Sequence, residues 1–190
     1  MWLERQQKDP FVINSVLKGF RSRSAFKILE INKKYSLFRP GLKLLDLGAS
    51  PGGWSQVASK TINKNNSGKV YAIDIKNMEP MEGIIFLQTD VFKLDKEYLL
   101  KKTDGKVNVI LSDMAPSSTG HKLTDQMRSE KLSLEAYFLA INLLDKNGDF
   151  CCKLLRGAGE KEFLNLVKKR FNKVNIFKPL SSRKESKEIF

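Results

Sequence analysis

Residues 46–56 read DLGASPGGWSQ, and this stretch decides the fold. It follows a short apolar run, so it predicts a tight glycine turn that leads from a β-strand into an α-helix. From Gly48 the spacing up to Gly53 is that of a phosphate loop, but Trp54 stands where such a loop has its lysine. A nicotinamide-dinucleotide loop would need its middle glycine two residues after Gly48, where Ser50 stands. Pro51 also removes a backbone N–H donor. The stretch therefore disfavours both kinds of phosphate-bearing ligand.

Apolar runs and amphipathic segments alternate along the chain of 190 residues. Strands are expected at residues 43–48, 70–74, 84–90, 107–113, 149–155, 173–179 and 187–190. Helices are expected at residues 22–35, from the glycines to about residue 60, within 121–148 up to a stop at Asn147-Gly148, and at 159–171. This alternation predicts the α/β class, with a mostly parallel seven-stranded sheet and helices on both faces of a single domain.

Five polar residues fall at the carboxyl ends of expected strands, where ligands bind in such sheets. They are Asp46, Asp74, Asp90, Asp113 and Lys153. Asp74 could accept both hydroxyls of a ribose, and Asp90 could accept from an exocyclic adenine N–H. A nucleoside without phosphates, with a zwitterionic tail against the glycine loop, fits S-adenosylmethionine. The competing interpretation is a structural glycine turn, with aspartates that only cap the helices that follow.

The net charge of +13 and the isoelectric point near 9.7 favour a polyanionic partner such as nucleic acid. Basic residues cluster at 18–27, 168–173 and 181–187, although a lysine-rich surface can also serve solubility alone.

Two adjacent cysteines and one histidine provide neither a disulfide framework nor a Cys/His metal site, and they favour an intracellular location. No apolar run approaches the roughly 20 residues that span a bilayer.

Several motifs, in this order along the chain, resemble the FtsJ/RrmJ-type RNA ribose 2′-O-methyltransferases. They are RSRSAFKILEI, DLGASPGGWSQ, LSDMAP, CCKLLRGAG and SSRKESKEIF, and the resemblance covers about residues 2–190. The start WLERQQKDPF is similar to mitochondrial members that act on large-subunit ribosomal RNA. The resemblance implies one Rossmann-like methyltransferase domain over residues 1–190, which uses S-adenosylmethionine. It also implies methylation of a ribose 2′-hydroxyl, that of a uridine in large-subunit ribosomal RNA.

The same resemblance implies the residues of the site. A catalytic tetrad maps onto Lys27, Asp113, Lys153 and Glu188. Cofactor contacts map onto Gly48, Pro51, Gly52, Gly53, Trp54, Asp74, Asp90 and Asp113. One departure concerns the end: the family's last strand continues past the glutamate, whereas this chain stops at Phe190, so either the sheet edge is incomplete or a tail is missing.

The residue types suit this chemistry on independent grounds. A sugar hydroxyl is a poor nucleophile, so it must lose a proton as it attacks a sulfonium methyl group. A lysine with its reference pKa of about 10.4 can be the base only when neutral; a nearby ammonium and desolvation lower a lysine pKa, and a carboxylate raises it. We hypothesise that Lys153 is the base, oriented by Asp113. Lys27 would hold the ribose-phosphate, and Glu188 would position Lys27 or the hydroxyl; taken alone, Lys27 could be a solvated charge and Glu188 a surface strand residue.

The motif around Asp113 also bears on the methyl acceptor. Asp-Met-Ala-Pro lacks the first proline and the aromatic residue of amino-directed enzymes, and neither cysteine follows a proline as in cytosine-carbon enzymes. A hydroxyl acceptor is therefore favoured, with no metal required. The basic rim expected to hold RNA consists of Arg21, Arg23, Arg156, Arg183 and Lys184, and the arm and helix of residues 1–36 contribute to it.

The expected partner is ribosomal RNA or the large ribosomal subunit, bound by a monomer in the cytoplasm or in mitochondria. Three alternatives stay open at this point. A transfer-RNA anticodon-loop 2′-O-methyltransferase would share the same core. A non-catalytic ribosome-assembly factor could keep the fold without the reaction. A dehydrogenase already conflicts with the glycine spacing.

Overall fold

The centre of the molecule is a five-stranded, all-parallel sheet, seen in a computed structural model that describes residues 9–190. Its strands stand in the order β3-β2-β1-β4-β5. Their bounds are β1 Lys43–Leu47, β2 Lys69–Asp74, β3 Ile84–Gln88, β4 Val107–Ser112 and β5 Leu144–Cys152. The chain reverses its direction of travel across the sheet between β1 and β4, and in open α/β sheets the ligand crevice lies at such a point.

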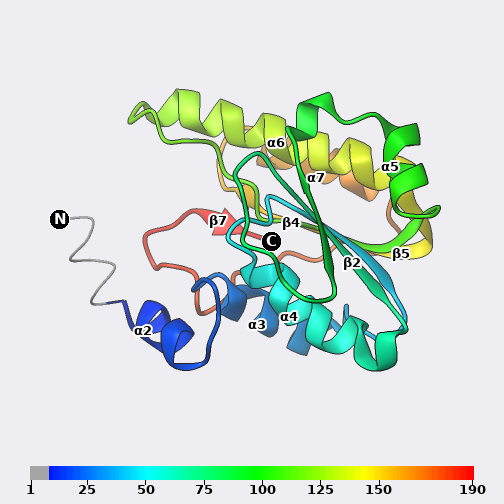
Figure 1. Cartoon of the computed structure of the whole chain (residues 1–190). Coiled ribbons are helices and arrows are strands. Elements are labelled where there is room, and N and C mark those ends of the chain that lie inside the picture. The colour runs from blue at the N-terminus through cyan, green and yellow to red at the C-terminus, as the bar shows by residue number, and fades with distance from the viewer. Residues whose placement is uncertain (1–8) are drawn as a thin grey trace.

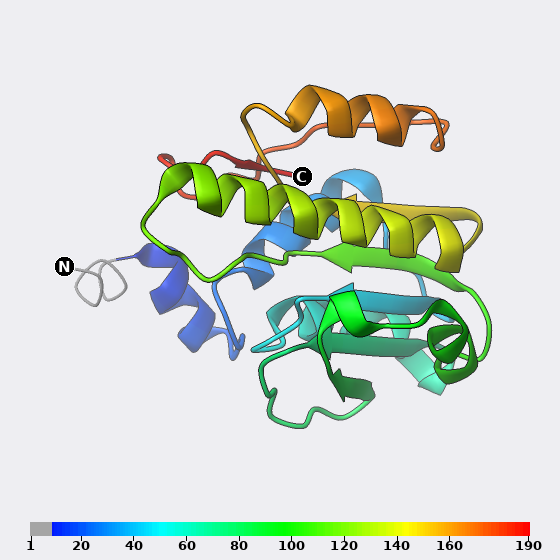
Figure 2. The same ribbon diagram turned by 90° about the horizontal axis from the view of Figure 1, so that it is seen from above.

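Helices cover both faces of this sheet, as Figures 1 and 2 show. On one face lie α3 (Ala25–Tyr35) and α4 (Gly53–Ile62), and on the other α5 (Lys96–Lys102) and α6 (Lys122–Leu143). The helix α7 (Glu160–Lys168) packs outside α6. The α/β class with a mostly parallel sheet and helices on both faces is thus confirmed.

Alternation along the central strands explains the two layers. In β1, Leu44 packs toward α3 and α4, whereas Leu45 packs toward α5 and α6, because successive side chains of a strand point to opposite faces. In β2, Val70 and Tyr71 divide in the same way. All four side chains are at most 1% exposed, so the inner strands are buried on both faces and read as continuous apolar runs.

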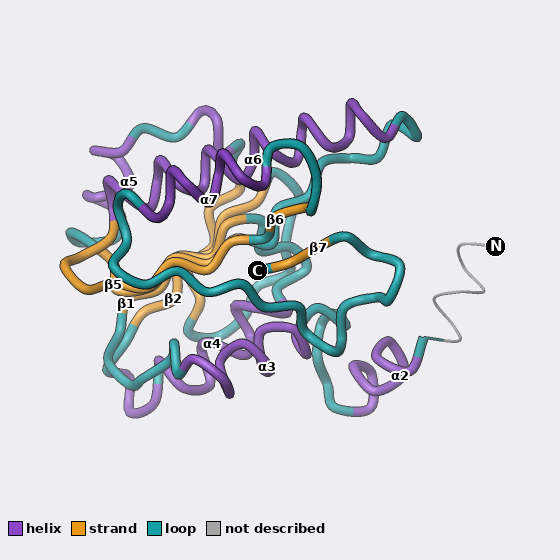
Figure 3. The backbone as a smooth tube through the Cα atoms, turned by 180° about the vertical axis from the view of Figure 1, so that it is seen from behind, coloured by secondary structure: helices purple, strands orange, loops and turns teal. Residues whose placement is uncertain are grey.

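The expected single sheet of seven strands is wrong in one respect. The last two strands, β6 (Leu154–Leu155) and β7 (Glu188–Ile189), form a separate antiparallel pair, visible beside the main sheet in Figure 3. Residues 173–179 form no strand, although Phe177 and Phe190 exchange two backbone hydrogen bonds of 2.8 Å. A cavity of about 790 Å³ is lined by this segment, by α7 and by β5, so the segment does not pair with the edge of β5.

Other element boundaries also differ from expectation. The long helix α6 ends at Leu143 rather than at Asn147-Gly148, and β5 follows it directly. Asn147 instead takes a left-handed conformation, with φ of 64°, where the pairing of β5 with β4 shifts in register.

Sequence analysis missed α2 (Pro10–Leu17) and α5, each of which begins after an aspartate whose carboxylate accepts a backbone N–H. Both helices are short, so they carry little periodicity. Two short 3₁₀ turns, η1 (Lys64–Asn66) and η2 (Val91–Lys93), complete the elements.

Residues 1–8, which hold most of the WLERQQKDPF stretch and the start of the expected N-terminal arm, lie outside the described residues. Within residues 9–190, no helix combines the length and the apolar character that crossing a bilayer requires.

Candidate active site

The glycine loop, residues 48–53, connects β1 to α4 with little room for side chains. Gly48 has φ of 77° and Gly52 has φ of 108°, a backbone region that favours glycine. A Cβ on Gly48 would lie 2.6 Å from the Met114 side chain, so the segment after β4 packs directly on the loop. A Cβ on Gly53 would collide with the hydroxyl of Ser22. The turn expected from the sequence is therefore present, and close approach on several sides explains its glycines.

Two aspartates expected to bind a cofactor stand beside this loop. Asp74 ends β2 and accepts backbone N–H groups of Ser50 at 2.9 Å and Lys76 at 2.8 Å. It thus fixes the loop, and the carboxylate keeps further acceptor positions because two oxygens offer about four. Asp90 lies two residues beyond β3 and caps η2 by accepting from Phe92 N at 3.1 Å. Asp90 thus also serves the capping role that sequence analysis held open, whereas the element that follows Asp74 is the strand β3.

Trp54, expected among the cofactor contacts, has its side chain in the core. It is 2% exposed, donates from Nε1 to the Ser24 carbonyl at 2.9 Å, and packs against the ring of Phe190 at 5.5 Å between centroids. The tryptophan that replaces the lysine of a phosphate loop therefore joins α4 to α3 and to the end of the chain. Only the backbone of this residue can face a ligand in the loop.

Asp46 does not contribute to the rim of the sheet, contrary to expectation. It lies within β1, is 1% exposed, and accepts the Ser55 hydroxyl at 2.6 Å, because its side chain points under α4. Burial raises the pKa of Asp46 to about 7, against the lowering effect of the Ser55 hydrogen bond. The residue connects the strand to the first turn of the helix, on the buried side of the glycine loop.

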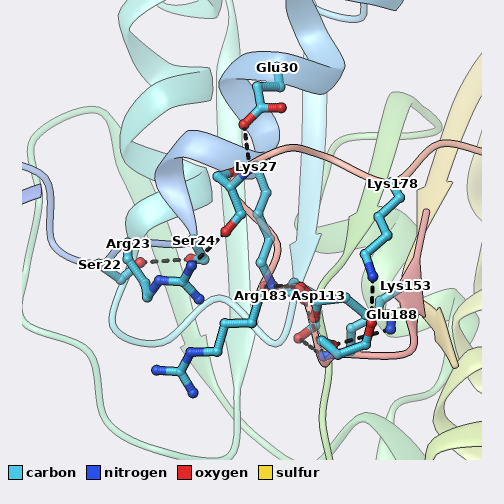
Figure 4. A network of polar contacts seen from close by, with 12 residues as sticks. Ser22, Arg23, Ser24, Lys27, Glu30, Asp113, Lys153, Lys178, Arg183 and Glu188 are labelled. Carbon is cyan, nitrogen blue, oxygen red and sulfur yellow. Dashed lines mark hydrogen bonds and ion pairs between the residues drawn. The ribbon is translucent and has the colours of Figure 1, made fainter. Parts of the chain in front are cut away.

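Four charged residues from four separate segments meet at the carboxyl edge of the sheet (Figure 4). After the role expected from the sequence, we name them the catalytic cluster: Lys27, Asp113, Lys153 and Glu188. Lys27 comes from α3, Asp113 follows β4, Lys153 joins β5 to β6, and Glu188 begins β7. All four side chains are at most 16% exposed.

Distances within the catalytic cluster define two linked pairs. Lys153 Nζ lies 3.1 Å from Asp113 Oδ1 and donates to the Asp113 carbonyl at 2.8 Å. Lys27 Nζ lies 2.8 Å from Glu188 Oε1 and 3.8 Å from Asp113 Oδ2. Asp113 therefore stands between the two ammonium groups. The structure thus brings together all four residues of the expected tetrad, in the pairing that the hypothesis assigned to Asp113 and Glu188.

The electrostatics of Glu188 follow from this geometry. Its burial alone would raise the pKa of the carboxyl, but the charge of Lys27 and the hydrogen bond from Lys27 outweigh burial and hold the pKa below its usual value. Glu188 is therefore ionised at neutral pH and keeps the Lys27 ammonium in place. The cluster combines two lysines with two acidic residues, so residues of opposite formal charge face each other in this buried site.

A polar recess of about 390 Å³ adjoins the catalytic cluster. Its lining consists of Arg23, Lys27, Arg183, Glu185, Ser186 and Glu188. Of the five residues expected at the RNA-binding rim, only Arg23 and Arg183 line it. Arg156 is an exposed residue that pairs with Glu160 at 3.4 Å, and the Lys184 side chain is exposed. Arg21 contacts backbone carbonyls of the loop after β2 instead.

Sequence analysis missed the residues that hold the walls of this recess. The Asp9 carboxylate lies 3.0 Å from Arg23 Nε and 3.5 Å from Arg183 Nε. Glu30 accepts the backbone N–H groups of Leu180 at 2.6 Å and Ser181 at 2.9 Å, which fixes the segment that leads to β7. Glu30 stands one helical turn after Lys27, but its partners lie 150 residues away, and no local pattern could have shown the contact.

Comparisons with known proteins agree with this architecture. The family model described as FtsJ-like methyltransferase matches residues 20–190. The ribosomal RNA large subunit methyltransferase E of Rickettsia akari is 47% identical over 193 residues, which cover 100% of this chain and 85% of that protein. The protein of the same name from Rickettsia bellii is 46% identical over the same shares. A crystal structure from Plasmodium falciparum, described as a ribosomal RNA methyltransferase, superposes with a TM-score of 0.79 at 30% identity, over 90% of this chain and 94% of that one.

The fold and the site thus define an α/β methyltransferase. The chain belongs to the FtsJ-like methyltransferase family. The resemblance on which the sequence-based expectations relied is confirmed, as is the expectation that the chain is a methyltransferase enzyme.

Proposed function

We propose that this protein transfers a methyl group from S-adenosylmethionine to a ribose 2′-hydroxyl of large-subunit ribosomal RNA. The single observation that carries the proposal is the catalytic cluster, in which a buried lysine, Lys153, is oriented by a carboxylate next to the glycine loop. The curated relatives named above are ribosomal RNA large subunit methyltransferases, which supports the choice of RNA. The net charge of +13 supports a polyanionic substrate.

The glycine loop and its surroundings fit S-adenosylmethionine better than a nucleotide. The loop has no lysine for phosphates, and Pro51 within it has no backbone N–H to donate to one. Asp74 and Asp90 follow neighbouring strands beside the loop, where they can accept from sugar hydroxyls and from an exocyclic amine. When bound, S-adenosylmethionine supplies an electrophilic methyl group on a positively charged sulfur.

The chain's own residues then act on the acceptor hydroxyl. Lys153 Nζ first gives one ammonium proton to water, and the neutral amine then takes the proton of the 2′-hydroxyl while the hydroxyl oxygen forms its bond to the methyl carbon. The carbon–sulfur bond breaks, its electron pair stays on sulfur, and the proton on Lys153 later passes to water. Asp113 holds the lysine through both its carboxylate and its carbonyl. Met114, the next residue, packs on Gly48, so the residue that holds Lys153 lies beside the glycine loop that would hold the cofactor.

We assign the recess beside the catalytic cluster to the sugar-phosphate of the acceptor nucleotide. Arg23 and Arg183 supply cationic donors for phosphate oxygens. Lys27, held by Glu188 at 2.8 Å, faces both the recess and Asp113. No group of histidine, cysteine or acidic side chains that could hold a metal ion occurs among residues 9–190, and the proposed chemistry requires none. A uridine acceptor, a monomeric enzyme, and a location in the cytoplasm or in mitochondria remain part of the proposal.

The proposal is tested with purified protein, methyl-labelled S-adenosylmethionine and three substrates: isolated large ribosomal subunits, deproteinised ribosomal RNA and total transfer RNA. We expect label in large-subunit RNA, presented free or within the subunit. Label in transfer RNA alone would replace the proposal by the anticodon-loop enzyme. Cofactor binding without label on any substrate would favour a non-catalytic assembly factor.

A further inference from the structure

Arg21 lies in the connection between α2 and α3, where the sequence predicted a contact with RNA. The side chain instead reaches the loop that follows β2. Its Nη1 donates to the Glu79 carbonyl and its Nη2 donates to the Pro80 carbonyl at 2.8 Å. A longer contact of 3.4 Å joins Nη1 to the carbonyl of Pro51 in the glycine loop. The guanidinium is therefore shared between two loops, and Arg21 is absent from the lining of the recess.

The loop that Arg21 grips, residues 75–82, covers the outer side of the glycine loop. A Cβ on Gly52 would lie 3.0 Å from Met78 Sδ, 3.1 Å from Met81 Cε and 3.2 Å from Arg21 Cδ. Met78 is 4% exposed, so the loop is packed down on the glycine rather than held away from it. Asp74, which ends β2, connects the base of the same loop to Ser50.

The backbone around Arg21 is also attached to α4. Arg21 N donates to Gln56 Oε1 at 3.0 Å, and Gln56 Nε2 donates to the Gly19 carbonyl at 2.7 Å. Three residues after Arg21, the Ser24 carbonyl accepts from the Trp54 indole. The segment between α2 and α3 is thus fixed on the first turns of α4. This fixes the backbone of Arg21, from which the planar guanidinium reaches the carbonyls.

We propose that Arg21 is a positioning residue for the cofactor rather than a ligand of the RNA. It holds residues 75–82 against the glycine loop and so shapes the wall beside Asp74. This inference rests on the proposed function, because it assumes that S-adenosylmethionine lies along this wall. Both terminal nitrogens of this guanidinium already donate to backbone carbonyls of two loops, which is the geometry of a residue that holds loops together.

The test compares Arg21→Gln with Arg21→Lys and with a control of equal charge change, Arg39→Gln. Arg39 is exposed and lies just before the amino end of β1, at the opposite edge of the sheet from the glycine loop. Calorimetry with S-adenosylhomocysteine gives cofactor affinity, filter binding at two salt concentrations gives RNA affinity, and steady-state rates separate KM from kcat. We expect Arg21→Gln to weaken S-adenosylhomocysteine about tenfold, which corresponds to about 1.4 kcal/mol.

The same variant should raise KM for S-adenosylmethionine with little change in kcat, and Arg21→Lys should recover part of the affinity because its ammonium can reach a carbonyl. RNA affinity and its salt dependence should match those of Arg39→Gln. Unchanged S-adenosylhomocysteine affinity, together with weaker RNA binding and a salt slope reduced by about one, would overturn the inference. Should Arg21→Gln fail to fold, the lysine variant carries the same comparison. Failure of the unmodified protein to bind S-adenosylhomocysteine would count against the proposed function itself.

Discussion

The glycine loop and the catalytic cluster adjoin each other but are built in opposite ways. The loop is one contiguous stretch, residues 48–53, whose shape depends on backbone conformation and close packing. The cluster takes one residue from each of four segments that span positions 27 to 188, and its members attract one another through charge. The loop offers no cationic side chain to a ligand, whereas the cluster offers two ammonium groups.

Because of this difference, substitutions in the two regions should change different properties of the protein. Changes in the glycine loop should affect how the cofactor is held, because the loop is a steric frame. Changes in the catalytic cluster should affect the chemical step, because in the proposed mechanism these residues act on the proton that must be moved. A loop substitution that lowered the transfer rate without changing cofactor affinity, or a cluster substitution that did the reverse, would contradict this separation.

The largest effect is expected for Lys153→Ala. Without an amine next to Asp113, the hydroxyl loses its proton acceptor, and the methyl-transfer rate should fall by about 10² to 10⁴. Affinity for S-adenosylhomocysteine should stay within about twofold, because the glycine loop is intact. Single-turnover transfer and calorimetry measure the two quantities, and Lys153→Arg, which keeps the charge but does not give up its proton, is the matched control. Substantial turnover by either variant would remove Lys153 from the role of base.

A smaller effect is expected for Glu188→Gln, which removes the charge that holds Lys27. We expect about a tenfold loss in rate and a loss of unfolding free energy on the order of 1 kcal/mol. Because the folded-state pKa of Glu188 is lowered, its stabilising effect is complete above the usual glutamate pKa of 4.5 and is lost as the pH falls through the lowered value. Urea unfolding of both proteins should therefore differ at neutral pH and converge in acid. A difference that persists in strong acid would contradict the role of this ion pair.

The smallest effect on activity is expected for Asp46→Asn, on the buried side of the glycine loop. Burial raises the pKa of Asp46 to about 7, so the folded protein binds a proton that the unfolded chain releases. The unfolding free energy of the unmodified protein should therefore fall as the pH rises from about 4 to about 7, by roughly 1 kcal/mol per pH unit. Urea unfolding at about pH 5 and about pH 8 should show the asparagine variant gaining relative stability at the higher pH. A stability difference independent of pH would contradict the raised pKa.

Sequence reasoning reached the parts of the molecule that local pattern encodes. The glycine turn and the apolar strands can each be predicted from a few consecutive residues. The resemblance to the family motifs identified the four residues of the catalytic cluster. Sequence reasoning missed Asp9 and Glu30, which contact partners far along the chain. It also gave no sign that Arg21 contacts backbone carbonyls, because such an arginine looks the same in sequence as one that binds phosphate. It also predicted a strand of the main sheet at residues 173–179, because the sequence of such a stretch does not reveal whether a neighbouring strand edge is close enough to pair.

The central claim, that the catalytic cluster activates a ribose hydroxyl, is tested most directly by locating the transferred methyl group. Large-subunit RNA labelled by the protein with methyl-labelled S-adenosylmethionine is hydrolysed in alkali, and the products are separated by size. A methyl group on a 2′-oxygen blocks cleavage of the neighbouring phosphodiester, so the account predicts label in alkali-resistant dinucleotides, absent with Lys153→Ala. Label recovered in mononucleotides, as expected from a methylated base, would contradict it.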